Sequence, residues 1–134
     1  MDTAYVVECA DVQMGNTLWY ADSLPVAWPN LGPEVLSAFY GCHMEYREET
    51  AWSTPILADW SEKSVGALRF SPENFYFRKV MEMTDALIEE GRGKFIVGYT
   101  DLHSGGDAIA AFRDPQQLLI DTIEHPAEIK SLCE

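Results

Sequence analysis

The feature that most constrains the fold is an amphipathic helix followed at once by a short apolar segment. The tripeptide Ser71-Pro72-Glu73 predicts the helix start, because serine caps free N–H groups, proline fits the first helical position and glutamate complements the helix dipole. Apolar residues then recur at steps of four, three and four: Tyr76, Val80, Met83 and Leu87. This spacing places all four on one face of the helix, turned toward a core.

The end of this helix and the segment after it indicate an α/β fold. Gly91 stands where a left-handed C-cap is expected. The apolar run Lys94–Tyr99, with its β-branched centre, predicts a buried strand. A helix that leads directly into a buried strand is typical of α/β folds and favours a parallel sheet.

The segment after the strand predicts a turn and short helices. Residues 100–107 are polar and contain glycine, and 108–112 are expected to begin a short helix. Asp114 is placed to cap a second helix, in which Gln117 is expected to complete a capping box. His125-Pro126 ends that helix, and Pro126 begins another.

The first sixty residues contain all four tryptophans and predict strands and structured loops. Residues 24–33 hold three prolines, which excludes a central strand and indicates a rigid extended loop. Residues 34–39 are compatible with one or two helical turns, and 49–57 with an extended segment that ends in a turn. Because no repeat, low-complexity run or linker interrupts the chain, we expect one domain over residues 1–134.

The charge balance argues against several classes of partner. The chain carries 22 Asp and Glu against 9 Lys and Arg, a formal net charge of -13. Such a surface repels nucleic-acid phosphates and anionic lipids, so we expect neither partner.

Three features of the sequence bear on localisation. No apolar run approaches the roughly 18 residues of a membrane helix, and the N-terminus lacks a basic region. The three cysteines are widely spaced and form no disulfide framework. A soluble, cytoplasmic protein is expected.

Asp101 and His103 are the first candidate site residues. They follow the predicted strand, and in parallel α/β sheets ligands bind at the carboxyl ends of strands. An aspartate and a histidine two residues apart on a turn can pair, bind a metal or serve as acid and base. The alternative is that Asp101 caps the following turn and that His103 is an ordinary surface histidine.

Cysteine and histidine are zinc ligands, but the adjacent pair Cys42-His43 is weak evidence for a zinc site. Adjacent residues seldom bind one tetrahedral ion together, and no second Cys/His pair has ligand spacing. We therefore expect a buried cysteine beside a surface histidine, and no metal.

Two longer stretches carry a family resemblance. Residues 20–33, with the sequence YADSLPVAWPNLGP, form one, and residues 98–113, with the sequence GYTDLHSGGDAIAAFR, form the other together with the following Asp-Pro-Gln-Gln-Leu. They resemble the decarboxylase-like branch of the uroporphyrinogen decarboxylase superfamily, which also includes corrinoid-dependent methyltransferases. The resemblance runs in order through nearly all of the chain.

This resemblance implies a substrate cleft and roles for four residues. Asp22 falls where the decarboxylases place the aspartate that hydrogen-bonds the pyrrole N–H groups of the porphyrinogen, which implies a catalytic role. Tyr99, Asp101 and His103 fall where a strand end lines the same cleft, which implies substrate binding, with a composition that suggests a different substrate. The decarboxylases work without a cofactor, so none is expected.

The resemblance also implies a (β/α)8 TIM barrel, of which this chain would form part. A whole barrel takes about 250 residues, so 134 residues are expected to supply two or three β/α units with an irregular Pro/Trp-rich N-terminal part. For this chain alone we expect no decarboxylation of uroporphyrinogen.

The first hypothesis for the function is a decarboxylase-like protein whose parent activity is decarboxylation of a tetrapyrrole or related small carboxylate. The second is a non-catalytic α/β protein that acts through self-association or a partner chain, and a corrinoid-linked methyltransferase relative is the third. Since an open part-barrel exposes strand edges, a homo-oligomer is expected.

Overall fold

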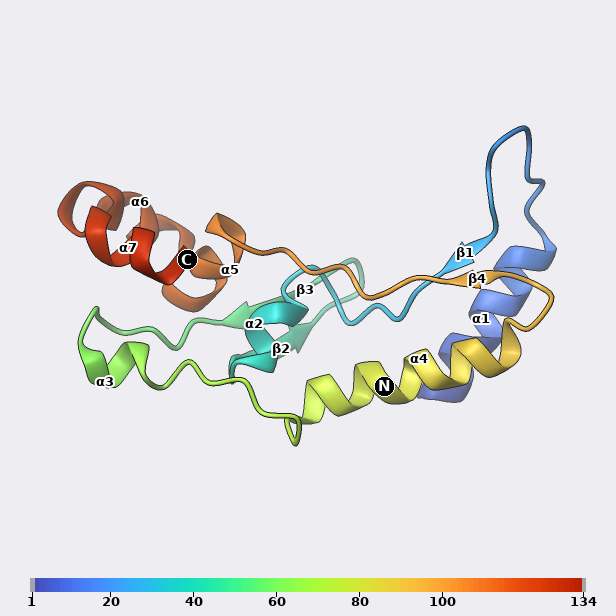
Figure 1. Ribbon diagram of the computed structural model, residues 1–134, viewed down its shortest axis with the longest axis horizontal. Coiled ribbons are helices and arrows are strands. Elements are labelled where there is room, and N and C mark those ends of the chain that lie inside the picture. The colour runs from blue at the N-terminus through green and yellow to red at the C-terminus, as the bar shows by residue number, and fades with distance from the viewer. Residues whose placement is uncertain (1, 134) are drawn as a thin grey trace. The chain divides into compact units, whose positions relative to one another are not determined.

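The computed structural model describes residues 2–133, which form two compact units (Figure 1). Unit 1 contains the residues up to Asn30 together with Arg78–Thr100. Unit 2 contains Leu31–Phe77 together with the residues from Asp101 onward. Each unit is therefore assembled from two separate stretches of the chain. The secondary structure is mixed α/β with few, short strands, as the sequence predicts at the level of fold class.

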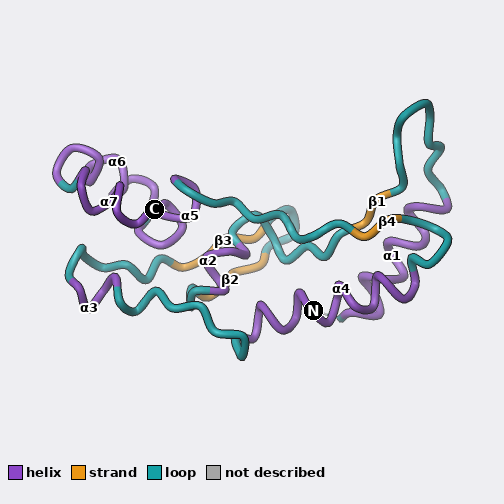
Figure 2. Tube along the Cα trace, viewed as in Figure 1, coloured by secondary structure: helices purple, strands orange, loops and turns teal. Residues whose placement is uncertain are grey.

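Unit 1 is built around a two-stranded parallel sheet, visible in Figure 2. β1 (Val26–Ala27) pairs with β4 (Ile96–Val97), Val26 opposite Ile96 and Ala27 opposite Val97. This pairing confirms the expected parallel arrangement. Two helices complete the unit, α1 (Thr3–Gly15) and the part of α4 (Phe75–Glu90) that begins at Arg78. Their core contains the buried residues Ala10, Ala27, Leu87 and Phe95, with Val7, Met14 and Val97 packed against it.

The N-terminal segment departs from the sequence prediction. Residues 3–15 were expected among strands and loops but form α1, whose start is capped by Asp2, the side chain of which accepts a hydrogen bond from Ala4 N at 2.9 Å. The proline-containing segment 24–33 is not wholly a loop, since Val26 and Ala27 lie between its prolines and make the β1 pairing. In the described residues, β1 pairs along one edge only, which is the arrangement that flanking prolines tolerate.

Helix α4 confirms the predicted apolar face and corrects the predicted ends. Val80, Met83 and Leu87 are buried. The helix begins at Phe75 rather than near Ser71, because Asn74 Oδ1 accepts hydrogen bonds from the backbone N–H groups at the first turn, at 2.9 and 3.1 Å. Asparagine is a strong N-cap, and it replaces the expected serine.

The exit from α4 depends on two glycines with different roles. Gly91 does not adopt the expected left-handed conformation; Gly93 does, with φ +74°. A Cβ on Gly91 would lie 2.8 Å from both Leu87 O and the Phe95 ring, so the close approach of Phe95 requires glycine there. The strand that follows is shorter than the expected Lys94–Tyr99: only Ile96–Val97 are paired, Phe95 is buried and Ile96 is half exposed.

Unit 2 combines an antiparallel hairpin with short helices. β2 (His43–Tyr46) pairs with β3 (Ala51–Thr54), Met44 opposite Ser53. The helices are α2 (Val35–Phe39), α3 (Glu62–Val65), α5 (Gly106–Arg113), α6 (Pro115–Glu124) and α7 (Pro126–Cys133). One buried cluster contains Cys42, Leu57, Ala108 and Phe112, and another contains Ala38, Met44 and Ala51.

Several predictions for unit 2 are confirmed. Helix α2 and the extended segment that holds β3 lie where they were expected, as do the short helix α5 and the break before α7. Asp114 caps α6, its carboxylate accepting from the backbone N–H groups of Gln116 and Gln117. Gln117 does not complete a capping box, because its side-chain amide donates to Asp121 Oδ1 at 3.1 Å. Strand β2 and helix α3 were not anticipated.

Candidate functional site

Asp101 and His103 are in direct contact. His103 Nε2 lies 3.0 Å from Asp101 Oδ2, and both side chains are exposed. They lie in unit 2, in the polar segment between β4 and α5. The N-cap of α5 is Gly105, so Asp101 does not cap that helix. The two side chains are therefore paired, and both are at the surface of unit 2.

The contact with Asp101 determines which ring nitrogen of His103 can bind a ligand. When Nε2 carries a proton, it donates it to the Asp101 carboxylate and the ring is held in one orientation. Nδ1 is then the nitrogen that remains for a ligand, as a hydrogen-bond acceptor in the neutral ring or as a donor in the imidazolium. An aspartate-oriented histidine of this kind is suited to proton transfer and to pairing with a carboxylate.

Asp22 and Tyr99, the other two predicted site residues, are both in unit 1 and both exposed. Asp22 lies in the turn that precedes β1, where Ser23 N donates to Tyr20 O at 3.0 Å. Tyr99 follows β4 and is 86% exposed. Because β1 and β4 run parallel, Asp22 is on the approach to one end of the sheet and Tyr99 on the exit from the other. Within residues 2–133 no hydrogen bond or ion pair joins the two.

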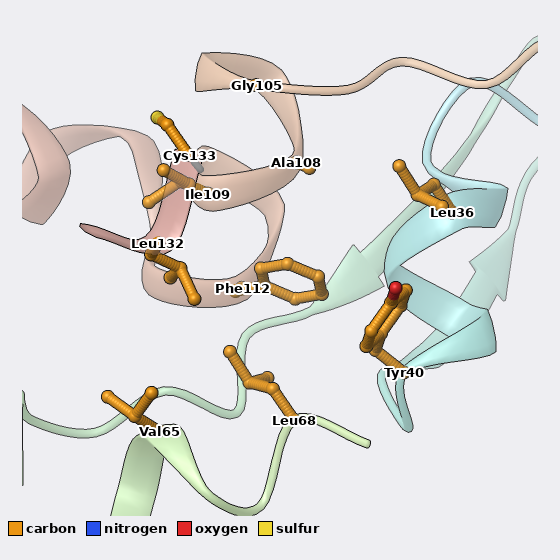
Figure 3. A pocket seen from close by; sticks show the side chains of 10 residues that line it. All are labelled: Leu36, Tyr40, Val65, Leu68, Gly105, Ala108, Ile109, Phe112, Leu132 and Cys133. Atoms are coloured by element: carbon orange, nitrogen blue, oxygen red, sulfur yellow. The ribbon is translucent and has the colours of Figure 1, made fainter. Parts of the chain in front are cut away.

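Unit 2 also contains an apolar pocket of about 300 Å³ (Figure 3). Its walls come from α2, α5, α7 and the region of α3. The lining residues are Leu36, Tyr40, Val65, Leu68, Gly105, Ala108, Ile109, Phe112, Leu132 and Cys133. None of them carries a formal charge, and the Tyr40 hydroxyl and Cys133 thiol are the polar side-chain groups in the wall. The pocket therefore suits the apolar part of a small molecule.

The Asp101–His103 pair lies close in the sequence to one residue of the pocket. Gly105 lines the pocket two residues after His103 and adopts φ +65°, a conformation that favours glycine. Sequence reasoning located the pair but missed the pocket. The residues that line the pocket come from four separated stretches of the chain, and nothing in the sequence around each stretch indicates that they share a cavity.

A buried ion pair holds the helices near this pocket. Asp121 is 1% exposed and accepts from Arg113 Nε at 2.6 Å. The same guanidinium donates to the backbone carbonyls of Leu57 and Ala58. The hydrogen bond from Arg113 is the main reason that the pKa of Asp121 falls from 3.8 to about 2. The pair thus ties α5 and α6 to the segment after β3.

One cluster of possible metal ligands in unit 2 includes a carboxylate that is already in an ion pair. Asp121, Glu124 and His125 each place one ligand atom within 4.8 Å of the others. The Asp121 carboxylate is already neutralised by Arg113, so a cation there would have to compete with a guanidinium at 2.6 Å. We assign this carboxylate to the ion pair.

The burial of Cys42 and the exposure of His43 agree with the sequence prediction. Cys42 is buried, and burial is the main cause that raises the pKa of its thiol to about 11. His43 is exposed, with Nδ1 3.1 Å from the hydroxyl of Tyr76. A thiol with so high a pKa stays protonated at neutral pH and is a poor nucleophile and metal ligand.

Comparison of the chain with known protein families, with curated proteins and with solved structures gave no match. Among residues 2–133, no helix is long and apolar enough to span a membrane.

Proposed function

We propose that the chain is a uroporphyrinogen decarboxylase-like protein that forms part of a (β/α)8 barrel and binds a small carboxylate. The observation that carries the proposal is the Asp101–His103 pair in the segment that leaves the parallel strand β4. The pair lies within unit 2, and its place in the sequence after β4 is where the resemblance implies substrate contacts.

The topology of unit 1 supports the barrel part of the proposal. In a barrel of this type, neighbouring strands run parallel and a helix lies between them in the sequence. β1 and β4 are parallel neighbours, and α4 lies between them in the chain. The hairpin of β2 and β3 is then an insertion within one such β-α-β unit.

The proposed chemistry follows from the imidazole. Decarboxylation breaks a carbon–carbon bond and leaves an electron pair on carbon, which must be captured by a proton. In this proposal His103, oriented by Asp101, pairs as imidazolium with the substrate carboxylate through Nδ1 or delivers that proton, and the contact between the two side chains supports this role. The apolar pocket that includes Gly105 would take the uncharged part of the substrate. The net charge of -13 favours a substrate with few carboxylates over a polycarboxylate.

The proposal is tested by titrating the chain with pyrrole-2-carboxylate at pH 6 and following the imidazole resonances of its three histidines by NMR. We expect saturable shifts of the His103 resonances, with His43 and His125 as internal controls. Asp101→Asn is expected to weaken binding about fivefold, since the loss of one charge-assisted hydrogen bond releases the ring. Pyrrole-2-carboxamide, which lacks the negative charge, should produce smaller shifts. Equal responses from all three histidines would refute a specific site.

Self-association is a second candidate function, favoured by one face of α6. Leu119 and Ile123 are one turn apart and are 71% and 84% exposed, and Ile120 beside them is half exposed. Apolar residues gathered in this way typically mark a protein contact. A second copy of the chain is the occupant that we propose, in keeping with the expected homo-oligomer.

Light scattering coupled to size exclusion tests this second candidate. We expect a dimer or larger species for the unmodified chain and a monomer of 15.1 kDa for Leu119→Glu combined with Ile123→Glu, because charges would be buried in the contact. A matched control, Ala4→Glu with Ala67→Glu, adds the same charge at exposed positions outside α6 and should not change the mass. A monomeric unmodified chain would count against the idea.

A further inference from the structure

We propose that unit 1 contains a second binding site, for a small, uncharged, planar heterocycle, in the pocket between α1 and β1. The pocket has a volume of about 310 Å³. Its lining residues are Tyr5, Val6, Cys9, Ala10, Gln13, Met14, Val26, Ala27, Trp28, Asn30 and Leu87. This site goes beyond the proposed function, since it shares no residue with the Asp101–His103 pair or with the pocket of unit 2.

Helix α1 supplies one polar edge of the pocket. Tyr5, Cys9 and Gln13 are spaced by four residues and therefore lie along one face of the helix. All three are exposed, although the helix buries Ala10 against the core of unit 1. The pocket thus has an apolar floor, formed by Ala10 with Ala27 and Leu87, beneath a rim of polar side chains.

β1 supplies the aromatic surface and the position in the sheet. Trp28 follows β1 directly and Asn30 comes two residues later, so both lie past the carboxyl end of a parallel strand, where ligands of α/β sheets bind. Trp28 is 49% exposed and so offers indole surface on which a flat ring can stack. At Gly98, just after β4, a Cβ would lie 3.7 Å from Trp28 Cβ, so the neighbouring strand exit packs beside this tryptophan.

The chemistry of the lining defines the class of ligand. No lining residue carries a formal charge, in a chain whose net charge is -13. The pKa of Tyr5 is raised, chiefly by its hydrogen bond with Cys9, so its hydroxyl stays protonated. Gln13 offers one amide donor and one acceptor, the complement of a lactam or amide edge on a ring. Stacking on Trp28 and pairing with an amide together select a neutral, flat heterocycle.

The test uses 2-quinolinone, a flat neutral lactam, and quinoline-2-carboxylate, a flat anion of similar size. Binding to the full chain is measured by saturation-transfer NMR. Protection of exposed Cys9 against iodoacetamide at pH 8 is measured by mass spectrometry, relative to the chain without added ligand. We expect saturable binding of 2-quinolinone, Cys9 protection by 2-quinolinone, and at least tenfold weaker protection of Cys9 by the carboxylate, since Cys9 lines this pocket.

Two substitutions separate the parts of the site. Gln13→Leu retains size and removes the amide, so we expect about a tenfold loss of affinity, as for one hydrogen-bonding group. Trp28→Leu removes the stacking surface and should abolish protection of Cys9. Gln116→Leu, the same change at an exposed position of α6, should leave binding unaltered. Because Gln13 is exposed, its variant should melt at the temperature of the unmodified chain.

Three results would overturn the proposal: no saturable binding of 2-quinolinone, equal protection of Cys9 by the anion, or unchanged affinity in Gln13→Leu. The test is independent of the proposed function, because His103 resonances and Cys9 protection report on different units. Loss of one response with the other intact shows which of the two sites is wrong.

Discussion

Asp121→Asn is expected to lower the free energy of unfolding of unit 2 by about 3 kcal/mol, the cost of leaving one partner of a buried ion pair without its counter-charge. The Asp121 carboxylate is 1% exposed, and the Arg113 that it neutralises is also largely buried. Asparagine keeps the shape of the side chain but cannot neutralise the guanidinium. Arg113 also donates hydrogen bonds to the carbonyls of Leu57 and Ala58, so the substitution is expected to destabilise the segment after β3 as well.

The buried thiol of Cys42 provides the measurement. In a background in which Cys9 and Cys133 are serine, the rate of Cys42 alkylation reports the opening of unit 2, because that side chain is 1% exposed. A loss of about 3 kcal/mol corresponds to an increase in rate of more than one hundredfold. Asp107→Asn, the same change at an exposed position of α5, should have little effect. Similar rates in the two variants would show that the ion pair does not hold the unit together.

The same ion pair sets an acid limit on stability. The pKa of Asp121 is about 2 in the folded chain, below its ordinary value of 3.8, mainly because Arg113 donates to it. A lowered carboxyl pKa contributes stability above the ordinary value, and this contribution is lost as the pH falls from about 4 toward 2. The midpoints of urea denaturation at pH 4 and pH 2.5 should therefore differ more for the unmodified chain than for Asp121→Asn.

Leu87→Ala is expected to lower the free energy of unfolding by about 3 kcal/mol through loss of core contacts and the cavity left behind. Leu87 is fully buried and belongs to the cluster that joins α1, β1 and the residues before β4. Urea denaturation followed by tryptophan fluorescence measures the effect. Truncation of the neighbouring Ile88, which is 48% exposed, removes a side chain of the same size from the same helix.

The difference between the two losses in free energy of unfolding shows whether the burial of Leu87 in the core of unit 1 contributes to stability. If Ile88→Ala costs as much as Leu87→Ala, the loss reflects helix stability rather than burial. A cost of less than 1 kcal/mol for Ile88→Ala beside about 3 kcal/mol for Leu87→Ala is the expected result.

The parts of the fold that the sequence predicted are those governed by local chemistry. The apolar face of α4 follows from residue spacing, and the Asp114 cap follows from side-chain chemistry next to Pro115. The start of α4 was displaced because Ser71 and Asn74 are both good caps, and only the folded backbone selects between them. Helix α1 was missed because it buries only Ala10 and so has almost no apolar periodicity.

The candidate site shows the same division. The contact between Asp101 and His103 was among the predicted alternatives because the two residues are neighbours on one turn. The Arg113–Asp121 pair crosses a helix break, and the two pockets draw their walls from segments far apart in the chain. Such associations depend on tertiary packing, which residue spacing does not encode.

The interleaving of the two units has a consequence for synthesis. β1 is made early, but its partner β4 and the Leu87–Phe95 part of its core come only after all of residues 31–77. Neither unit can close on the ribosome before most of the chain has emerged, and the long loop between the paired strands slows their encounter. During that interval the backbone groups of β1 that later pair with β4 remain an open strand edge.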